Sequence, residues 1–237
     1  MSRSAWIDGI LDFCYPNRCD CCGSLIPYRA VICEECRVQL EKLTISYTDW
    51  CRSETTQPIP WRHLITVYAY QALAREGILA MKEGHRQFAV HLAQKLSLIA
   101  VKELPLSQID FVTWVPIAKR RRAEQGYGHS EYLAKQLAAR LYLPVKGGLL
   151  VQEHTQQRQH HNKTAKEREA FAQRFHKTNA DLTGKTILLC DDVLTTGHTL
   201  RRCVSLLQEM GADTVYGAVG ACRLIEQQVS ISKGDTA

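Results

Sequence analysis

Two adjacent carboxylates, Asp191 and Asp192, follow a short apolar run and precede a loop of small hydroxyl residues. The apolar run, residues 187–190, has the length and composition of a buried parallel strand. A helical pattern begins at Thr199 and continues to Met210. Ligands of open α/β sheets bind at the carboxyl ends of the strands, so the carboxylates and the loop are expected to form a binding site.

The chemistry of this stretch suits a sugar phosphate. A helix start presents unsatisfied backbone N–H groups and the positive end of a dipole, and both attract phosphate. Glycine lets the backbone approach closely, and threonine hydroxyls donate to phosphate oxygens. We therefore predict that Asp191 and Asp192 are catalytic residues, holding ribose hydroxyls or Mg²⁺. The predicted 5-phosphate loop is Val193, Leu194, Thr195, Thr196, Gly197, His198 and Thr199.

Two other interpretations of the stretch are available. An ATPase also has a strand that ends in acids, but it needs a Gly-x-x-x-x-Gly-Lys-[Ser/Thr] loop after an earlier strand. The Gly184-Lys185-Thr186 sequence precedes the strand, and Asn179 stands where the first glycine belongs, so this class is excluded. The alternative of an ordinary buried strand with capping acids predicts no ligand at all.

Four cysteines in two pairs, Cys19 with Cys22 and Cys33 with Cys36, have metal-ligand spacing. Gly23 permits the positive φ that such knuckles use. Four thiolates with no open position predict a structural Zn²⁺ site, whose metal would supply folding energy to a small ribbon. A redox pair and an Fe–S cluster are the alternatives. Two further cysteines, at positions 14 and 51, lie outside the pairs and are interpreted as non-ligands.

The net charge and the hydropathy pattern restrict the kinds of protein that this chain can be. The net charge of +6 is a mild excess that is compatible with an anionic ligand. The N-terminal segment, residues 1–15, has the pattern of a short amphipathic helix and is too short and too acidic for a secretion signal. No segment reaches 18 consecutive apolar residues. We expect a soluble, cytoplasmic protein that does not span the membrane, and there clustered cysteines favour metal over disulfides.

Three basic segments are candidates for phosphate or nucleic-acid contacts. Four consecutive cations follow the predicted strand 111–115, and at that place they could face a pyrophosphate or a DNA backbone. Lys82 lies near the end of a predicted helix, and a polar, basic stretch at 152–174 is predicted to form a flap over the pocket. A solvated surface is the alternative for each. The four cations are Lys119, Arg120, Arg121 and Arg122.

The remaining pattern predicts an α/β fold, with a parallel sheet of about five strands flanked by helices. We predict an N-terminal helix, ribbon and linker at 1–60 and the α/β domain at 61–237. The predicted strands are 64–70, 111–115, 143–151, 187–190 and 214–222, and the predicted helices are 72–82, 88–101, 130–141 and 199–210.

The stretch 187–200 resembles the phosphoribosyl-pyrophosphate motif of the type I phosphoribosyltransferases. Together with the cysteine pairs, it resembles the ComF family, including GntX-type members. The other matching pieces are Met81-Lys82 with Gly84, Val115-Pro116, Arg121, Gly126-Tyr127 and Leu133-Ala134.

The resemblance to the ComF family implies a zinc ribbon on a phosphoribosyltransferase-like domain that binds phosphoribosyl pyrophosphate with Mg²⁺. It further implies a cytoplasmic role in natural transformation, in which single-stranded DNA and competence-machinery proteins at the inner face of the membrane are the partners. An active phosphoribosyltransferase and a phosphoribosyl-pyrophosphate sensor are the alternatives. Gln125, Gly128 and His129 depart from the family pattern, so the 5-phosphate loop is matched more closely than the acceptor pocket.

Overall fold

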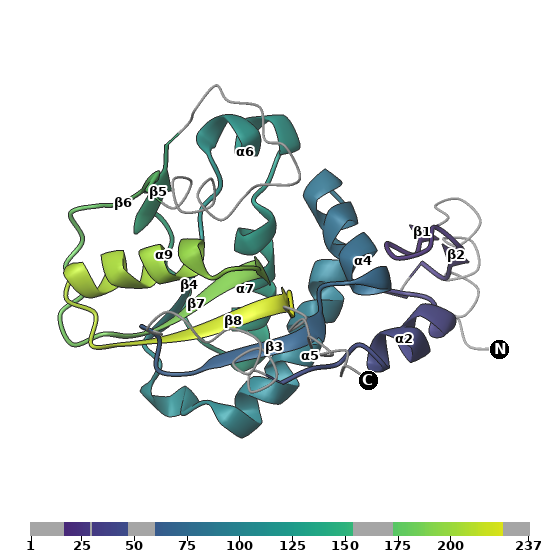
Figure 1. Ribbon diagram of the computed structural model, residues 1–237, viewed down its shortest axis with the longest axis horizontal. Helices are drawn as coiled ribbons and strands as arrows, with labels where there is room; N and C mark the ends of the chain where they lie inside the picture. The colour runs from purple at the N-terminus through teal and green to yellow at the C-terminus, as the bar shows by residue number, and fades with distance from the viewer. Residues whose placement is uncertain (1–16, 29, 47–59, 154–172, 225–237) are drawn as a thin grey trace, which may run out of the picture.

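The computed structural model describes residues 17–28, 30–46, 60–153 and 173–224. Its centre is a parallel sheet of four strands in the order β3-β8-β7-β4 (Figure 1). The strands β3, β7 and β8 are buried along nearly their whole length, as expected of strands covered on both faces. The strands are β3 (Leu64–Ala69), β4 (Phe111–Trp114), β7 (Thr186–Leu194) and β8 (Thr214–Cys222).

Helices cover both faces of the sheet and divide the core into two apolar clusters. α5 (Gln87–Glu103) and α7 (His129–Leu141) pack on one face, and α9 (His198–Glu209) packs on the other. α9 also contacts β6 (Phe175–Lys177), which pairs antiparallel with β5 (Leu150–Gln152). The predicted α/β class is therefore confirmed.

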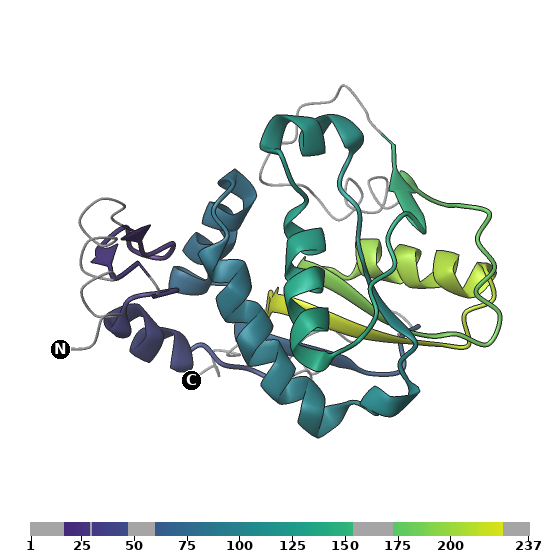
Figure 2. The ribbon, with the colours of Figure 1, turned by 180° about the vertical axis from the view of Figure 1, so that it is seen from behind.

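Two further helices lie toward the carboxyl ends of the strands. α4 (Ala72–Glu83) follows β3 and lies beside the tips of β7 and β8 in both views, and α6 (Lys119–Gln125) follows β4 (Figures 1 and 2). A single 3-10 turn, η1 (Leu106–Gln108), leads from α5 into β4. The edge of the sheet predicted to bind a ligand is thus bordered by α4 and α6.

Two predicted strands differ from the structure. β7 does not end at Cys190 but runs through both aspartates to Leu194, because its parallel pairing with β8 continues at Asp191 opposite Val219. The segment predicted as a strand over 143–151 contributes one bridge, Val145 to Val112, and then only β5. The sheet therefore has four strands instead of about five.

The N-terminal ribbon consists of β1 (Asn17–Arg18), β2 (Leu25–Ile26) and α2 (Glu34–Glu41). The stretch after α2 was predicted to be an irregular linker, but Thr44 bridges antiparallel to Tyr68 at the edge of the main sheet. The rest of that predicted linker, at 47–59, lies outside the described residues, as do the amphipathic helix at 1–15 and most of the basic flap. The division of the chain at residue 60 stays a prediction.

Asp20 fastens the ribbon to the main body. Its fully buried carboxylate accepts a hydrogen bond from the backbone N–H of Phe88 (2.8 Å), which caps the start of α5 from outside the helix. Its other oxygen lies 3.2 Å from Nδ1 of His85. Burial raises the pKa of Asp20, although the hydrogen bond from Phe88 and the charge of His85 partly offset this.

Within the described parts of the chain, no helix combines the length and the apolar character needed to cross a bilayer.

The cap supplied by Asp20 can be tested by substitution. We expect Asp20→Ala to lower the free energy of unfolding by about 1–2 kcal/mol, because the N–H of Phe88 loses its buried acceptor. Asp20→Asn keeps an acceptor oxygen and should lose clearly less. Urea unfolding of the two variants measures both values, and equal losses would contradict a role based on the hydrogen bond.

Candidate functional site

The acid pair lies inside β7, the second strand from the β4 edge of the sheet. Asp191 is 9% exposed and Asp192 is 6% exposed, which is unusual for ionisable residues unless they are paired. Backbone groups contribute to their environment, since the N–H of Asp192 donates to Asp191 (2.9 Å) and the N–H of Val193 donates to Asp192 (2.9 Å). The pair is therefore built into the fold, at the end of the strand that leads to the phosphate loop.

Two basic residues from different helices lie beside the carboxylate of Asp192. Nζ of Lys82, in the last turn of α4, lies 2.9 Å from Oδ2 of Asp192, and Nε2 of His129, at the start of α7, lies 3.5 Å from the same oxygen. Burial alone would raise the pKa of Asp192, but the charges of Lys82 and His129 more than offset it and hold this pKa well below its usual range. Burial favours the neutral amine of Lys82, yet the charge of Asp192 leaves its pKa raised.

Asp191 has the opposite electrostatic environment. Burial, together with the neighbouring charge of Asp192, raises the pKa of Asp191 well above that of an exposed aspartate. The hydroxyl of Ser130 donates to Oδ1 of Asp191 (3.0 Å) and partly offsets the shift. The pair is thus asymmetric: Asp192 is an ionised carboxylate with cations beside it, and Asp191 is inclined to keep its proton.

The predicted phosphate loop leads directly into α9, which begins one residue earlier than predicted, at His198. Gly197 precedes the helix with φ of +77°, a conformation that favours glycine. A side chain at this position would also collide with Arg201, because an added Cβ would stand 2.8 Å from Nη1. The hydroxyl of Thr196 lies 3.0 Å from Nδ1 of His198.

Arg201 places a guanidinium at the phosphate loop. Its Nη1 donates to the backbone oxygen of Thr196 (2.7 Å), and its guanidinium carbon lies 5.8 Å from the centre of the Trp61 ring. The loop therefore combines a helix start, hydroxyl groups and a fixed positive charge, which is the set of features that binds a phosphate monoester.

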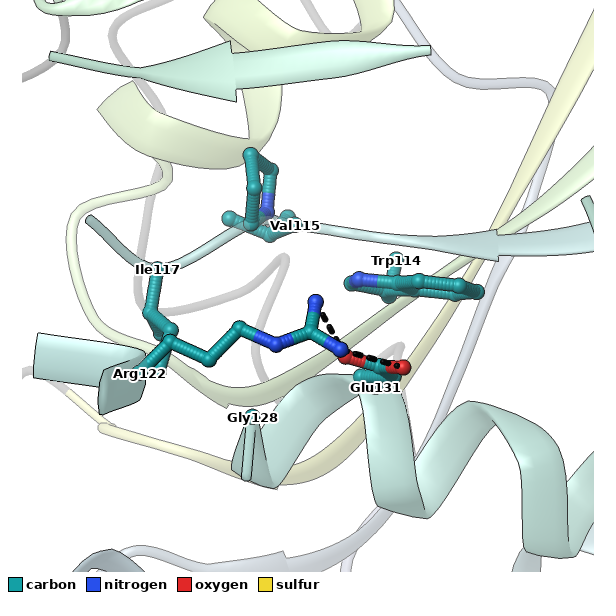
Figure 3. A pocket seen from close by; sticks show the side chains of 7 residues that line it. Trp114, Val115, Ile117, Arg122, Gly128 and Glu131 are labelled. Carbon is teal, nitrogen blue, oxygen red and sulfur yellow. Dashed lines mark hydrogen bonds and ion pairs between the residues drawn. The ribbon is translucent and has the colours of Figure 1, made fainter. Parts of the chain in front are cut away.

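A small pocket lies at the carboxyl end of β4, between that strand and the start of α7 (Figure 3). Its interior volume of about 30 Å³ holds only one or two water molecules. The guanidinium of Arg122 points into it and pairs with the carboxylate of Glu131 (Nη1 to Oε2, 2.9 Å), as Figure 3 shows. Glu131 also pairs with Lys135 (2.7 Å). The Arg122–Glu131 pair thus lines the pocket and connects α6 to α7.

The five cations predicted for the pyrophosphate or nucleic-acid side differ in their surroundings. Lys82 is held against Asp192, and Arg122 is held by Glu131. Lys119 and Arg120 are exposed at the start of α6, which is a short helix. The side chain of Arg121 lies outside the described residues.

The four predicted cysteine ligands come together. The Sγ atoms of Cys19, Cys22, Cys33 and Cys36 all lie within 4.8 Å of one another. Backbone N–H groups of Cys33 and Cys36 donate to sulfurs of the cluster (3.4 Å each). Hydrogen bonding with Ser24 lowers the pKa of Cys22 to about 6, whereas burial raises that of Cys36. The cluster can bind a metal, whose charge would keep the buried thiols deprotonated.

Three residues of the site were not found from the sequence as site residues: His129, Ser130 and Arg201. His129 and Ser130 act through tertiary placement, because α7 brings them to β7, and Ser130 lies 61 residues before Asp191 in the chain. Arg201 offered a local signal, since a residue four positions after Gly197 lies one helical turn above the loop.

Comparison with known proteins finds a similarity to one domain family. Residues 128–235 match the family described as "Phosphoribosyl transferase domain". The protein named "DNA utilization protein YhgH" from Salmonella typhimurium is 25% identical over 201 residues, covering 83% of this chain and 86% of that protein. The protein of the same name from Escherichia coli K12 is 24% identical over the same shares of the two chains.

Among solved structures, the glutamine phosphoribosylpyrophosphate amidotransferase from B. subtilis covers 61% of this chain and 27% of its own, with a TM-score of 0.38 and 21% identity.

The asymmetry of the acid pair predicts opposite effects of two isosteric substitutions. Asp192→Asn leaves Lys82 beside a neutral group and should lower the free energy of unfolding at pH 7 by up to about 3 kcal/mol. Asp191→Asn removes a carboxyl that resists ionisation and should be neutral or stabilising. Any gain should shrink as the pH falls toward the unfolded pKa of about 4, because the wild-type carboxyl is then protonated in both states.

Urea unfolding of both variants between pH 4 and pH 7 measures these effects. Equal destabilisation by the two substitutions, or a gain for Asp191→Asn that grows at low pH, would contradict the asymmetric charge assignment.

Proposed function

We propose that the chain is a ComF-family DNA-utilisation protein that binds a phosphoribosyl ligand. The observation that carries the proposal is the phosphate loop at the start of α9, directly after the acid pair at the end of β7. The relatives named for DNA utilisation support the DNA part of the proposal, and the family match supports the phosphoribosyl part.

The geometry suggests how a phosphoribosyl group would lie. Its 5-phosphate would accept hydrogen bonds from the N–H groups and hydroxyls of the loop, with Arg201 adding charge. Its ribose hydroxyls would donate to Asp192, because an ionised carboxylate accepts and does not donate, and they would lie beside Asp191. In phosphoribosyl pyrophosphate, the pyrophosphate would point toward α6, where Lys119 and Arg120 are exposed. We propose that Mg²⁺ accompanies this pyrophosphate.

Transfer chemistry is a further candidate function. In a phosphoribosyl transfer, C1 gains oxocarbenium character as the pyrophosphate leaves, and cations stabilise the departing charge. The described residues provide the cations, but the pocket beside Trp114 is small and is lined by the Arg122–Glu131 pair. This observation favours binding over transfer, and in this account the ligand is a regulator of DNA handling.

Zn²⁺ is proposed for the cysteine cluster. The four thiolates of Cys19, Cys22, Cys33 and Cys36 surround one centre and match the tetrahedral preference of Zn²⁺. Together they fill all four coordination positions, so none is left open. The ion would stabilise the ribbon, and through Asp20 the ribbon would stabilise the start of α5. We place the protein in the cytoplasm, where reduced thiols keep such a site loaded.

The phosphate loop is tested by calorimetric titration with phosphoribosyl pyrophosphate in the presence of Mg²⁺. We expect wild-type binding and a loss of at least about tenfold in the Thr195→Val/Thr199→Val double variant, because hydrogen bonds to a charged phosphate are worth about 1.5–3 kcal/mol each. Thr214→Val, at the opposite end of the sheet, is the control. Absence of binding to wild type would refute the phosphoribosyl proposal.

The DNA-binding role is tested by fluorescence anisotropy with single-stranded DNA at several salt concentrations. Substituting Lys119 and Arg120 by alanine should weaken binding and reduce the log–log salt slope by about 1.4, because two phosphate contacts are lost. Lys102→Ala, at the far end of α5, should leave the slope unchanged. An unchanged slope in the double variant would remove α6 from the DNA surface.

A further inference from the structure

A cation of the protein itself, the ammonium of Lys82, lies beside the acid pair. Lys82 reaches Asp192 with a side chain that is 27% exposed, against a carboxylate that is 8% exposed. His129 approaches the same oxygen from the other side, with a side chain that is 8% exposed. Two positively charged or chargeable groups thus converge on one oxygen, Oδ2 of Asp192, at the position where a divalent cation would bind.

Two of the three remaining oxygens of the pair already accept hydrogen bonds from the protein. Mg²⁺ requires near-octahedral oxygen coordination at 2.0–2.1 Å and favours ionised carboxylates. Oδ1 of Asp191 already accepts from Ser130 and from the N–H of Asp192. Oδ1 of Asp192 accepts from the N–H of Val193. The residues present therefore do not fit a Mg²⁺ ion bound directly between the two carboxylates.

The position of Lys82 is fixed by contacts on both sides of its helix end. Gly84 ends α4 with φ of +114°. Tyr127, in the loop before α7, donates to the backbone oxygen of Met81 and lies within hydrogen-bond distance of that of His85 (2.9 Å). On the other side, Asp20 of the ribbon contacts His85. A side chain held in this way is preorganised, so it needs little rearrangement to act at Asp192.

We propose that the ammonium of Lys82, assisted by His129, replaces a divalent cation at the acid pair. This inference rests on the proposed phosphoribosyl site and specifies it. The ribose and 5-phosphate part of the ligand binds without Mg²⁺, and the ion is needed only by ligands that carry a pyrophosphate. The site then takes a pentose 5-phosphate monoester as a metal-independent ligand.

The first test uses ribose 5-phosphate, which has no pyrophosphate to bind Mg²⁺ strongly. Calorimetric titration of wild type should give the same affinity, within about twofold, in EDTA-free buffer without Mg²⁺ and in millimolar Mg²⁺. Lys82→Met should bind at least about tenfold more weakly without Mg²⁺ and recover when Mg²⁺ is added. Lys82→Arg, which keeps the charge, should resemble wild type.

Wild-type binding that requires Mg²⁺, or a Lys82→Met variant with unchanged metal-free affinity, would overturn the inference.

The second test separates this inference from the proposed function, because it uses no sugar phosphate. Mn²⁺, followed by its electron paramagnetic resonance signal, replaces Mg²⁺ in titrations of the zinc-loaded protein. Wild type and Lys82→Arg should bind no Mn²⁺ at the acid pair, whereas Lys82→Met should gain a site that is lost again in Lys82→Met/Asp192→Asn. Mn²⁺ binding by wild type that Asp192→Asn abolishes would refute the role of Lys82.

Failure of wild type to bind any phosphoribosyl ligand would instead refute the proposed function, and the Mn²⁺ titration would still decide whether Lys82 takes the place of the metal.

Discussion

The structure depends on the burial of two adjacent carboxylates at the end of a core strand. Such burial is unfavourable unless the charge is paired, and here the pairing partners come from two separate helices. Lys82 fixes the end of α4 and His129 fixes the start of α7 relative to β7. The same contacts that make the buried charge tolerable therefore set the geometry of the ligand edge of the sheet.

The N-terminal ribbon contacts the main body at the turn between α4 and α5. Its cysteine cluster holds the turn that carries Asp20, and Asp20 caps α5 and contacts His85. The turn between α4 and α5 lies just after Lys82, and Tyr127 holds it from the opposite side. Metal binding in the ribbon and the position of the ammonium beside Asp192 are connected by a short series of direct contacts.

Local patterns in the sequence were sufficient for the class of fold, the cysteine cluster and the position of the loop that leads into α9. Each of these features is recognised from a few neighbouring residues: an apolar run, two C-x2-C pairs and a glycine before a helix. The partners of the acids could not be predicted in this way, because Lys82 and His129 lie far from Asp192 in sequence and meet it only through packing. The length of β7 was also missed, since charged residues rarely continue a buried strand unless cations that are distant in sequence neutralise them.

The most direct test of the account is a crystal structure of the protein with ribose 5-phosphate, grown without divalent cations other than zinc. The account predicts the phosphate at the N–H groups of residues 197–199, the ribose hydroxyls at the acid pair, and Nζ of Lys82 still beside Asp192. A sugar phosphate bound elsewhere, or Lys82 displaced from Asp192 by a metal ion carried over from the protein, would contradict it.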